Sequence, residues 1–345
     1  MRAWRVVAIL GASTAAAVTL AAAAGCTSGE ALTGPAVGVL ETRGRVHLVD
    51  LKSGEVRRTH RLRSPAYDID ADPDTGFFVT AQSGGVGNEA DDRMGVIDVR
   101  GPRGVRYVKL PMPNPGGVAV VGDGRVVLDH GIEEKEGMFV CLADTRSMSV
   151  VRSGHVPDNN TPMRVIDGVG WASCVDMDGR ASLRRVNTET LESEEVLGGG
   201  DFPIIWDSGP EGLYGWLIEE PGKARIARFH PKTGAVEASA TITFEDGPGA
   251  MVASRGRLLV ADFTGEDLDR HGSRLLVIDP ATLEVEREIR VPGGPCDLKA
   301  WRDRVVVAVY RDKTLRIVDP ANGSIERTID LPEMSPLPFN IAVMD

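Results

Sequence analysis

The chain repeats one sequence motif that is typical of a β-hairpin, and this repeat limits the possible folds more than any other feature. Residues 275–292 read "LLVIDPATLEVEREIRVP", and residues 315–332 read "LRIVDPANGSIERTIDLP". Each copy holds an apolar run with strand alternation, a turn led by Asp, and a second alternating run, which together predict an antiparallel hairpin. The residue that leads the turn recurs seven times, 40 to 49 positions apart, as Asp50, Asp98, Asp144, Asn187, His230, Asp279 and Asp319. Such self-similarity indicates a repeat architecture, and Asp or Asn suits the corner because its side chain can accept the turn amides.

A second recurring sequence motif lies between consecutive hairpins. It begins at a Pro and contains two more apolar strands separated by Gly or charged residues, as in "PGGVAVVGDGRVVLDHG" and "PCDLKAWRDRVVVAVYRD". The Pro recurs at positions 65, 115, 162, 203, 248, 295 and 338. Four short strands per period, with no helical periodicity beyond the N-terminal segment, predict an all-β, seven-bladed β-propeller with four antiparallel strands per blade.

The two ends of the repeat region complement each other. The C-terminal "PLPFNIAVMD" supplies one strand of a blade, and residues 36–60 supply three. We therefore expect residues 36–345 to form one closed domain, in which a composite blade joins three N-terminal strands to one C-terminal strand. Such closure protects a sheet edge that would otherwise be exposed.

The repeats resemble the YVTN family of propeller repeats. The resemblance is carried by "VIDPATLEVEREI" and "IVDPANGSIERTI", and by Phe78-Val79-Thr80-Ala81 in place of the box that names the family. It covers residues 36–345 and implies the propeller fold. It implies no particular function, because one fold of this kind hosts many roles.

The first thirty residues, "MRAWRVVAILGASTAAAVTLAAAAGCTSGE", predict export. A basic start followed by an uncharged, Ala-rich run is typical of a signal peptide. The sequence around Cys26 resembles a bacterial lipobox, which implies that residues 1–25 are removed, that Cys26 is lipidated, and that residues 26–35 form a tether. We expect the chain to be lipid-anchored on the outer face of the cytoplasmic membrane or in the cell envelope. An ordinary signal peptide that leaves Cys26 unmodified is the alternative.

Charge and cysteine content limit the partners and the cross-links. A formal net charge of −11 argues against nucleic acid, and it argues against docking of the domain surface on anionic lipid. Beyond Cys26 the chain has three cysteines, Cys141, Cys174 and Cys296. A disulfide between the first two and a pair of buried free thiols both remain open.

The innermost strand of each blade should line a central channel. The residue two positions after each recurring Pro should face the channel mouth, and Asp68 interrupts a neighbouring row that is otherwise apolar. An Asp that forms an ion pair with Arg164 and closes the channel is the structural alternative to a ligand site. The candidate ligand-binding residues at the mouth are Tyr67, Asp68, Arg164, Asp297 and Asn340.

Acidic loops should lie on the same face as the channel mouth. Two of them, residues 82–94 and 262–274, are the longest and are candidates for contacting a partner. Their carboxylates could also contribute oxygen ligands to a divalent cation, although neither loop has a calcium-loop spacing. No other cofactor is predicted, and the metal ligands stay unknown. The candidate acids are Glu89, Asp91, Asp92, Glu266, Asp267 and Asp269.

Catalytic signatures are absent from the sequence. It contains no GxSxG, HExxH, CxxC or GxxxxGK[ST] motif, and its six His are scattered. We therefore assign no catalytic residue and expect a surface-anchored binding or scaffold module, a monomeric disc whose loop face holds a protein, peptide or glycan. The alternative is a lactonase-like or other hydrolase, with Asp68, Asp297 and Asn340 at the channel mouth.

Overall fold

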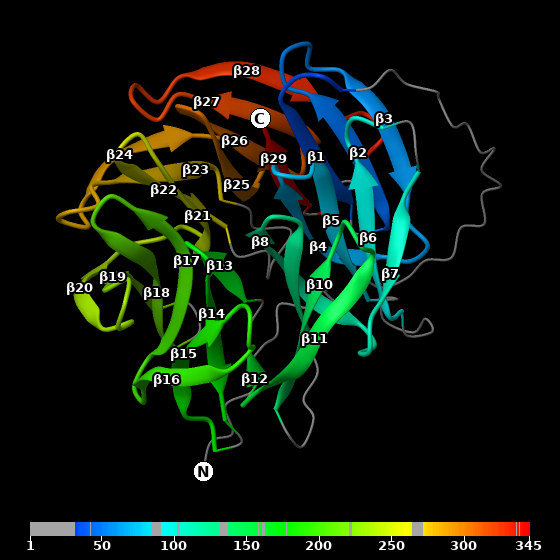
Figure 1. The fold of residues 1–345 in the computed structure, drawn as a ribbon. Helices are drawn as coiled ribbons and strands as arrows, with labels where there is room; N and C mark the ends of the chain where they lie inside the picture. Colours follow the sequence, from blue (N-terminus) through cyan, green and yellow to red (C-terminus); the bar gives the residue numbers. More distant parts are fainter. Residues whose placement is uncertain are drawn as a thin grey trace, which may run out of the picture.

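The computed structural model shows seven antiparallel sheets arranged in a ring (Figure 1). It describes residues 32–41, 43–83, 91–101, 104–130, 137–157, 159–160, 163–176, 178–220, 223–263, 272–335, 337 and 339–345. These residues contain no α-helix, and none of their segments forms a helix long and apolar enough to cross a membrane. The predicted seven-bladed β-propeller is confirmed.

The blades are numbered from the composite one, and each is given from its innermost to its outermost strand. Blade 1 contains β29 (Asn340–Met344), β1 (Ala36–Glu41), β2 (Arg45–Asp50) and β3 (Val56–Arg61). Blade 2 contains β4 (Ala66–Asp72), β5 (Phe77–Gln82), β6 (Arg93–Asp98) and β7 (Arg106–Lys109). Blade 3 contains β8 (Pro115–Gly122), β9 (Arg125–His130), β10 (Met138–Asp144) and β11 (Ser149–Val156).

Blade 4 has a divided innermost strand, because β12 (Asn159–Asn160) and β13 (Arg164–Ile166) both pair with β14 (Val169–Val175). The blade continues with β15 (Ala181–Asn187) and β16 (Ser193–Gly198). Blade 5 contains β17 (Phe202–Gly209), β18 (Gly212–Glu220), β19 (Lys223–Phe229) and β20 (Val236–Thr241). Blade 6 contains β21 (Pro248–Ser254), β22 (Arg257–Asp262), β23 (Arg274–Ile278) and β24 (Val285–Arg290). Blade 7 contains β25 (Pro295–Trp301), β26 (Arg304–Val309), β27 (Thr314–Val318) and β28 (Ile325–Asp330).

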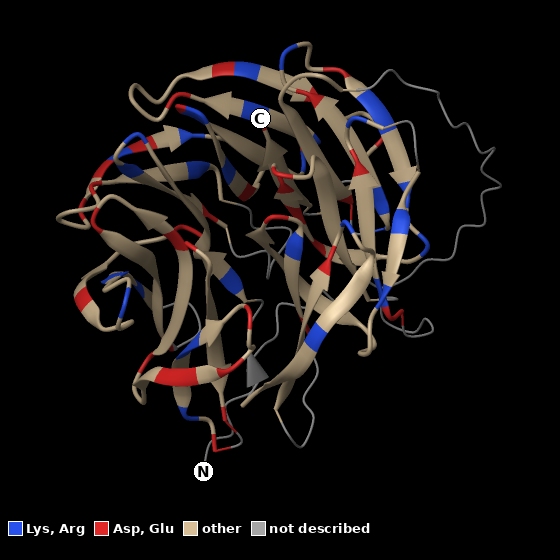
Figure 2. Ribbon diagram, in the orientation of Figure 1, with Lys and Arg blue, Asp and Glu red and all other residues tan. Residues whose placement is uncertain are grey.

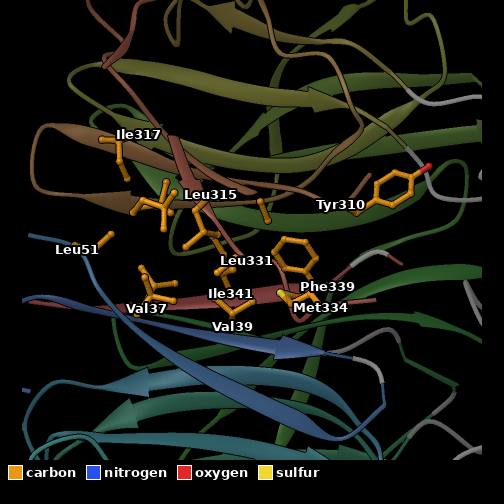
Figure 3. Packing of buried hydrophobic residues seen from close by; sticks show 14 of the residues in the cluster. Val37, Val39, Leu51, Tyr310, Leu315, Ile317, Leu331, Met334, Phe339 and Ile341 are labelled. Carbon is orange, nitrogen blue, oxygen red and sulfur yellow. The ribbon is translucent and has the colours of Figure 1, made fainter. Parts of the chain in front are cut away.

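The composite blade closes the ring as expected. Strand β29 pairs antiparallel with β1 over five residues, from Leu40 opposite Asn340 to Ala36 opposite Met344. The hydrophobic core at this junction combines side chains of blades 1 and 7, with Ile341 and Phe339 fully buried between them (Figure 3). The two ends of the propeller domain are therefore held in one sheet and one core.

The corner residues of the seven hairpins act on their own turns. Asp279 Oδ1 accepts the amides of Ala281 at 2.8 Å and Thr282 at 2.9 Å. Five other corners accept two amides in the same way, including His230, whose Nδ1 accepts both at 3.2 Å, and Asp319 accepts one, from Ala321 at 2.7 Å. The repeated Asp is thus a turn-stabilising residue, as its position in the motif predicts.

Arginines on the two outer strands connect blades 1, 4, 5, 6 and 7 each to the following blade. The Arg327 guanidinium of blade 7 donates to the carbonyls of Leu51 at 3.0 Å and Lys52 at 2.7 Å in blade 1. The side chains of Arg58, Arg185, Arg228 and Arg287 donate in the same way to turn carbonyls of the following blade. These charge-assisted bonds hold the outer rim together, while apolar side chains fill the space between the sheets.

Candidate functional site

Seven charged side chains lie on the innermost strands, and six of them remain when Asp72, which stabilises the turn at the end of β4, is set aside. The six are Asp68 and Asp70 on β4, Arg164 on β13, Asp207 on β17, and Asp297 and Lys299 on β25. Arg164 and Lys299 each lower the pKa of three of the carboxyls, those of Asp68, Asp70 and Asp207, although the two cations come from different blades. The ring therefore brings one mixed-charge cluster, hereafter the axial cluster, to the propeller axis.

The strand registers place Asp68 differently from the sequence alignment. Asp68 lies opposite Ala81 and Asp297 lies opposite Ala308, each one residue past a bulge in its innermost strand. The recurring Pro in blade 2 stands one residue earlier than in blade 7, so Ala66 is the counterpart of Pro295. Asp68 therefore belongs to the row of Asp297 and does not interrupt an apolar row; that expectation was wrong.

Asp68 and Asp297 make equivalent bonds between blades. The carboxylate of Asp297 accepts the amide of Leu298 at 2.8 Å and, across the blade boundary, the amide of Ile341 at 2.9 Å. Asp68 does the same with its own next residue at 3.0 Å and with Val118 of blade 3 at 3.2 Å. An innermost strand has a free edge facing the axis, and these carboxylates satisfy amides that no strand pairs with.

Two acids that the sequence analysis missed make the same kind of bridge. Asp207 accepts the amide of Ala253 in blade 6 at 2.7 Å, and Asp70 accepts that of Val120 in blade 3 at 2.8 Å. Both acids follow a bulge in their innermost strand, Asp207 by one residue and Asp70 by three. The sequence does not show where the bulges lie, so it gave no usable signal for either acid.

In blade 3 the carboxylate that bonds to the next blade comes from Asp129 on the second strand, β9, rather than from the innermost strand. The residue in the Asp68 row is Gly117, which has no side chain, and Asp129 lies opposite it on β9. Its carboxylate accepts the amide of Met163 in blade 4 at 2.6 Å. A cross-strand neighbour thus supplies the carboxylate that the glycine position lacks.

Asn340 and Arg164, the remaining polar side chains predicted at the mouth, each contact the next blade. The Asn340 side-chain amide donates to the carbonyl of Tyr67 at 2.6 Å, which links blade 1 to blade 2. The Arg164 guanidinium stacks 5.0 Å from the ring centroid of Trp206, and among the described residues no ion pair joins it to Asp68 or Asp297. The structural alternative of an Asp–Arg164 ion pair is therefore not seen.

Burial raises the pKa of several carboxyls of this region. It raises the pKa of Asp68 to about 6, against the attraction of Arg164 and Lys299. It raises the pKa of Asp129 to about 7, with Asp68 adding to the increase. The pKa values of Asp70 and Asp207 are raised for the same reason. These groups therefore hold protons to higher pH than ordinary carboxyls do.

Stability is expected to fall as the pH rises from about 4 to 7. A folded-state pKa above the unfolded value means that the folded protein binds more protons in this window, so deprotonation disfavours it. Asp129 is 3% exposed and should dominate, with an effect of order 2–4 kcal/mol. Urea unfolding of the wild type and of Asp129→Asn at pH 4.5 and 7.5 tests this, because the neutral amide should flatten the slope. An unchanged slope in the variant would contradict it.

Of the six predicted loop acids, Asp91 and Asp92 lie among the described residues. Asp91 is buried, accepts a hydrogen bond from the Ser64 hydroxyl and lies 3.4 Å from the Arg93 guanidinium, so it holds its own loop end. Asp92 is half-exposed beside Lys109, with 3.6 Å between the charged atoms. The other predicted acids, Glu89, Glu266, Asp267 and Asp269, lie outside the described residues, as does Cys26.

The described residues contain three cysteines and no cluster of metal ligands. Within the described ranges no group of three or more His, Cys, Asp or Glu side chains is placed to hold a metal ion. A divalent cation in the acidic loops stays a prediction. Cys141, Cys174 and Cys296 are free thiols, and burial raises the pKa of Cys296 to about 12. The Cys296 thiol donates to the carbonyl of Phe339 at 3.3 Å.

Comparison with known proteins supports the fold. No protein-family model matches the chain, and a search of curated proteins finds no match. Among solved structures, a functionally unknown protein from Desulfotomaculum acetoxidans DSM 771 has a TM-score of 0.63 at 11% identity, covering 90% of this chain and 99% of that one. The protein from Bacteroides fragilis NCTC 9343 named as a putative 6-phosphogluconolactonase has a TM-score of 0.62 at 13% identity, with 91% and 99% covered.

A third similar structure is the dihydro-heme d1 dehydrogenase NirN in complex with DHE. Its TM-score is 0.59 at 15% identity, and the match covers 86% of this chain but only 64% of the length of NirN. All three identities are too low to carry a function across. The fold and the comparisons define the class of this protein as a seven-bladed β-propeller, a class that includes both enzymes and binding proteins.

Proposed function

We propose that this chain is an exported, lipid-anchored propeller of the YVTN type that acts as a non-catalytic binding or scaffold module. A protein, peptide or glycan of the cell envelope is its partner, and the loop face at the axis mouth is the binding surface. The half-exposed Asp92, together with the acids of residues 82–94 and 262–274, supplies the charge for a basic partner.

The proposal of a non-catalytic role rests on the hydrogen bonds of the polar residues at the mouth. The polar groups best placed for chemistry at the mouth, Asp68, Asp297 and Asn340, are each committed to a hydrogen bond between blades. A general acid or base must instead be within hydrogen-bonding reach of a substrate proton. A rigid ring whose axial groups hold the blades together is suited to presenting loops, and Tyr67, 37% exposed at the mouth, adds an aromatic contact surface.

The anchor is tested by Cys26→Ala. The proposal expects this variant to lose most of its membrane-bound fraction and to appear in the medium or soluble envelope fraction, because the acyl chains are attached at this residue. Fractionation of intact cells followed by immunoblotting measures the distribution, with Cys296→Ala as the matched control that keeps the anchor. Retention of Cys26→Ala at the membrane would contradict lipid anchoring.

A propeller hydrolase is the second candidate, and one observation favours it. The pKa of Asp68 at about 6 lies close to neutrality, where a general base is most effective. A lactone-hydrolysis assay, with and without added divalent cations, tests this function. Turnover by the wild type that is lost in Asp68→Asn would support the enzyme, and no turnover across a lactone panel would leave the binding module.

A further inference from the structure

Charge is unevenly distributed over the seven outermost strands. Three consecutive ones, β3, β7 and β11, contain cationic residues and no Asp or Glu. The next two outermost strands in the ring, β16 and β20, contain Glu and no Lys or Arg. Figure 2 shows this separation as blue bands on β3, β7 and β11 and red on β16. A chain with an acidic total therefore has one basic side.

Several cations of this side are free to meet a partner. Among the described residues, no carboxylate lies within ion-pair distance of Arg61, Arg106 or Arg152, and Arg61 and Arg152 are exposed. The guanidiniums of Arg106 and Arg63 each lie 4.9 Å from an aromatic ring centroid, Phe77 and Tyr107 respectively. Stacking of this kind holds a guanidinium at the surface without neutralising it.

The chain enters the propeller on the same side. Leu32, the first described residue, is buried in the core shared by blades 1 and 2, and its amide donates to the carbonyl of Val99 at 3.4 Å. Six residue steps separate Leu32 from Cys26, which reach about 20 Å when fully extended. With Cys26 in the lipid, blades 1 and 2 must therefore lie close to the membrane surface.

We propose that the basic rim, formed by β3, β7 and β11 with Arg63, docks on the anionic lipid head groups of the membrane that carries the anchor. This rests on the proposed lipid anchor. The total charge of −11 alone argues against such docking. Screening confines the interaction to about 8 Å at physiological salt, so the local charge of the facing rim decides it. Guanidinium groups suit the task because they bind phosphate in a bidentate manner.

The test uses a chain of residues 27–345, which retains every strand of the propeller and carries no lipid. Co-sedimentation is measured with phosphatidylcholine vesicles, with and without 30% phosphatidylglycerol. We expect at least tenfold tighter binding to the anionic vesicles at low ionic strength, lost in high salt. The variant Arg61→Gln/Arg106→Gln/Arg152→Gln should reduce that binding at least fivefold. The control Lys232→Gln/Arg290→Gln/Lys313→Gln removes the same charge from blades 5, 6 and 7 and should leave it unchanged.

Three results would overturn the inference. These are equal binding to neutral and anionic vesicles, equal loss in the two triple variants, and binding to soluble polyphosphate without binding to the vesicles, which would indicate an anionic polymer as the partner. Circular dichroism of both triple variants confirms that they are folded. Because the soluble chain lacks the anchor, failure here leaves the Cys26→Ala result, and with it the proposed function, unaffected.

Discussion

Ending the chain at Ser335 is expected to abolish cooperative folding, because the composite blade then loses its innermost strand β29. The deletion removes Phe339, Ile341 and Met344, all almost fully buried, and each contributes about 1.5–3 kcal/mol through burial. Their sum approaches the total stability of a typical domain, about 5–15 kcal/mol. The deletion also exposes the edge of β1 and removes the hydrogen bond that the Ile341 amide donates to the Asp297 carboxylate. Circular dichroism and urea unfolding measure the loss.

The matched control for this deletion removes the other end. A chain that begins at residue 27 keeps β1 and every later strand, so it should unfold cooperatively at the wild-type midpoint. If the chain ending at Ser335 also unfolded at that midpoint, ring closure through β29 would not stabilise the propeller.

Asp262→Ala is expected to destabilise the protein by about 3–5 kcal/mol, the range for removing one partner of a buried ion pair. Asp262 is fully buried at the end of β22. It accepts the amides of Glu245, Asp246 and Gly247 at 2.8 to 3.1 Å, and its carboxylate lies 2.8 Å from the Arg274 guanidinium. The alanine would leave the three amides without this acceptor where the chain enters blade 6, while Arg274 would keep its ion pair with Glu288 at 2.6 Å.

Asp279→Ala is the control for Asp262→Ala. Its carboxylate also accepts two amides, but the corner is exposed and water can replace the bonds. We therefore expect a much smaller loss of stability than in Asp262→Ala. Equal losses in the two variants, measured by urea unfolding, would mean that burial of the Asp262 network is not what makes it stabilising.

The sequence was sufficient for the architecture because the architecture is periodic. The seven corner residues fix the number of blades, and the complementary ends fix the composite blade. Both depend on local patterns that survive in one chain. Three of the arginines that bond to the next blade also share a sequence pattern. Arg58, Arg287 and Arg327 each stand two residues after a β-branched residue that begins the outermost strand.

The axial cluster could be predicted only in part. The sequence placed Tyr67, Asp68, Arg164, Asp297 and Asn340 on innermost strands. The partners of Asp68, Asp297 and Asn340 are backbone groups of the next blade, 44 to 50 residues away for the two aspartates. Such pairings depend on the bulges, which shift the register without a mark in the sequence. Asp129 was missed because its role follows from the absence of a side chain at Gly117, a relation between two strands rather than within one.

The carboxylates at the mouth hold the blades together through bonds to backbone amides of the next blade. The most direct test is the free energy of unfolding of Asp68→Ala and Asp297→Ala, measured in urea at pH 7. Removing a buried acceptor that serves two amides should lower it by about 1–3 kcal/mol in each variant, and more for Asp297, which is the more buried of the two. Groups retained for chemistry often lower stability, so their removal leaves it unchanged or raises it. Unchanged or increased stability in both variants would contradict the account and favour an active site at the axis.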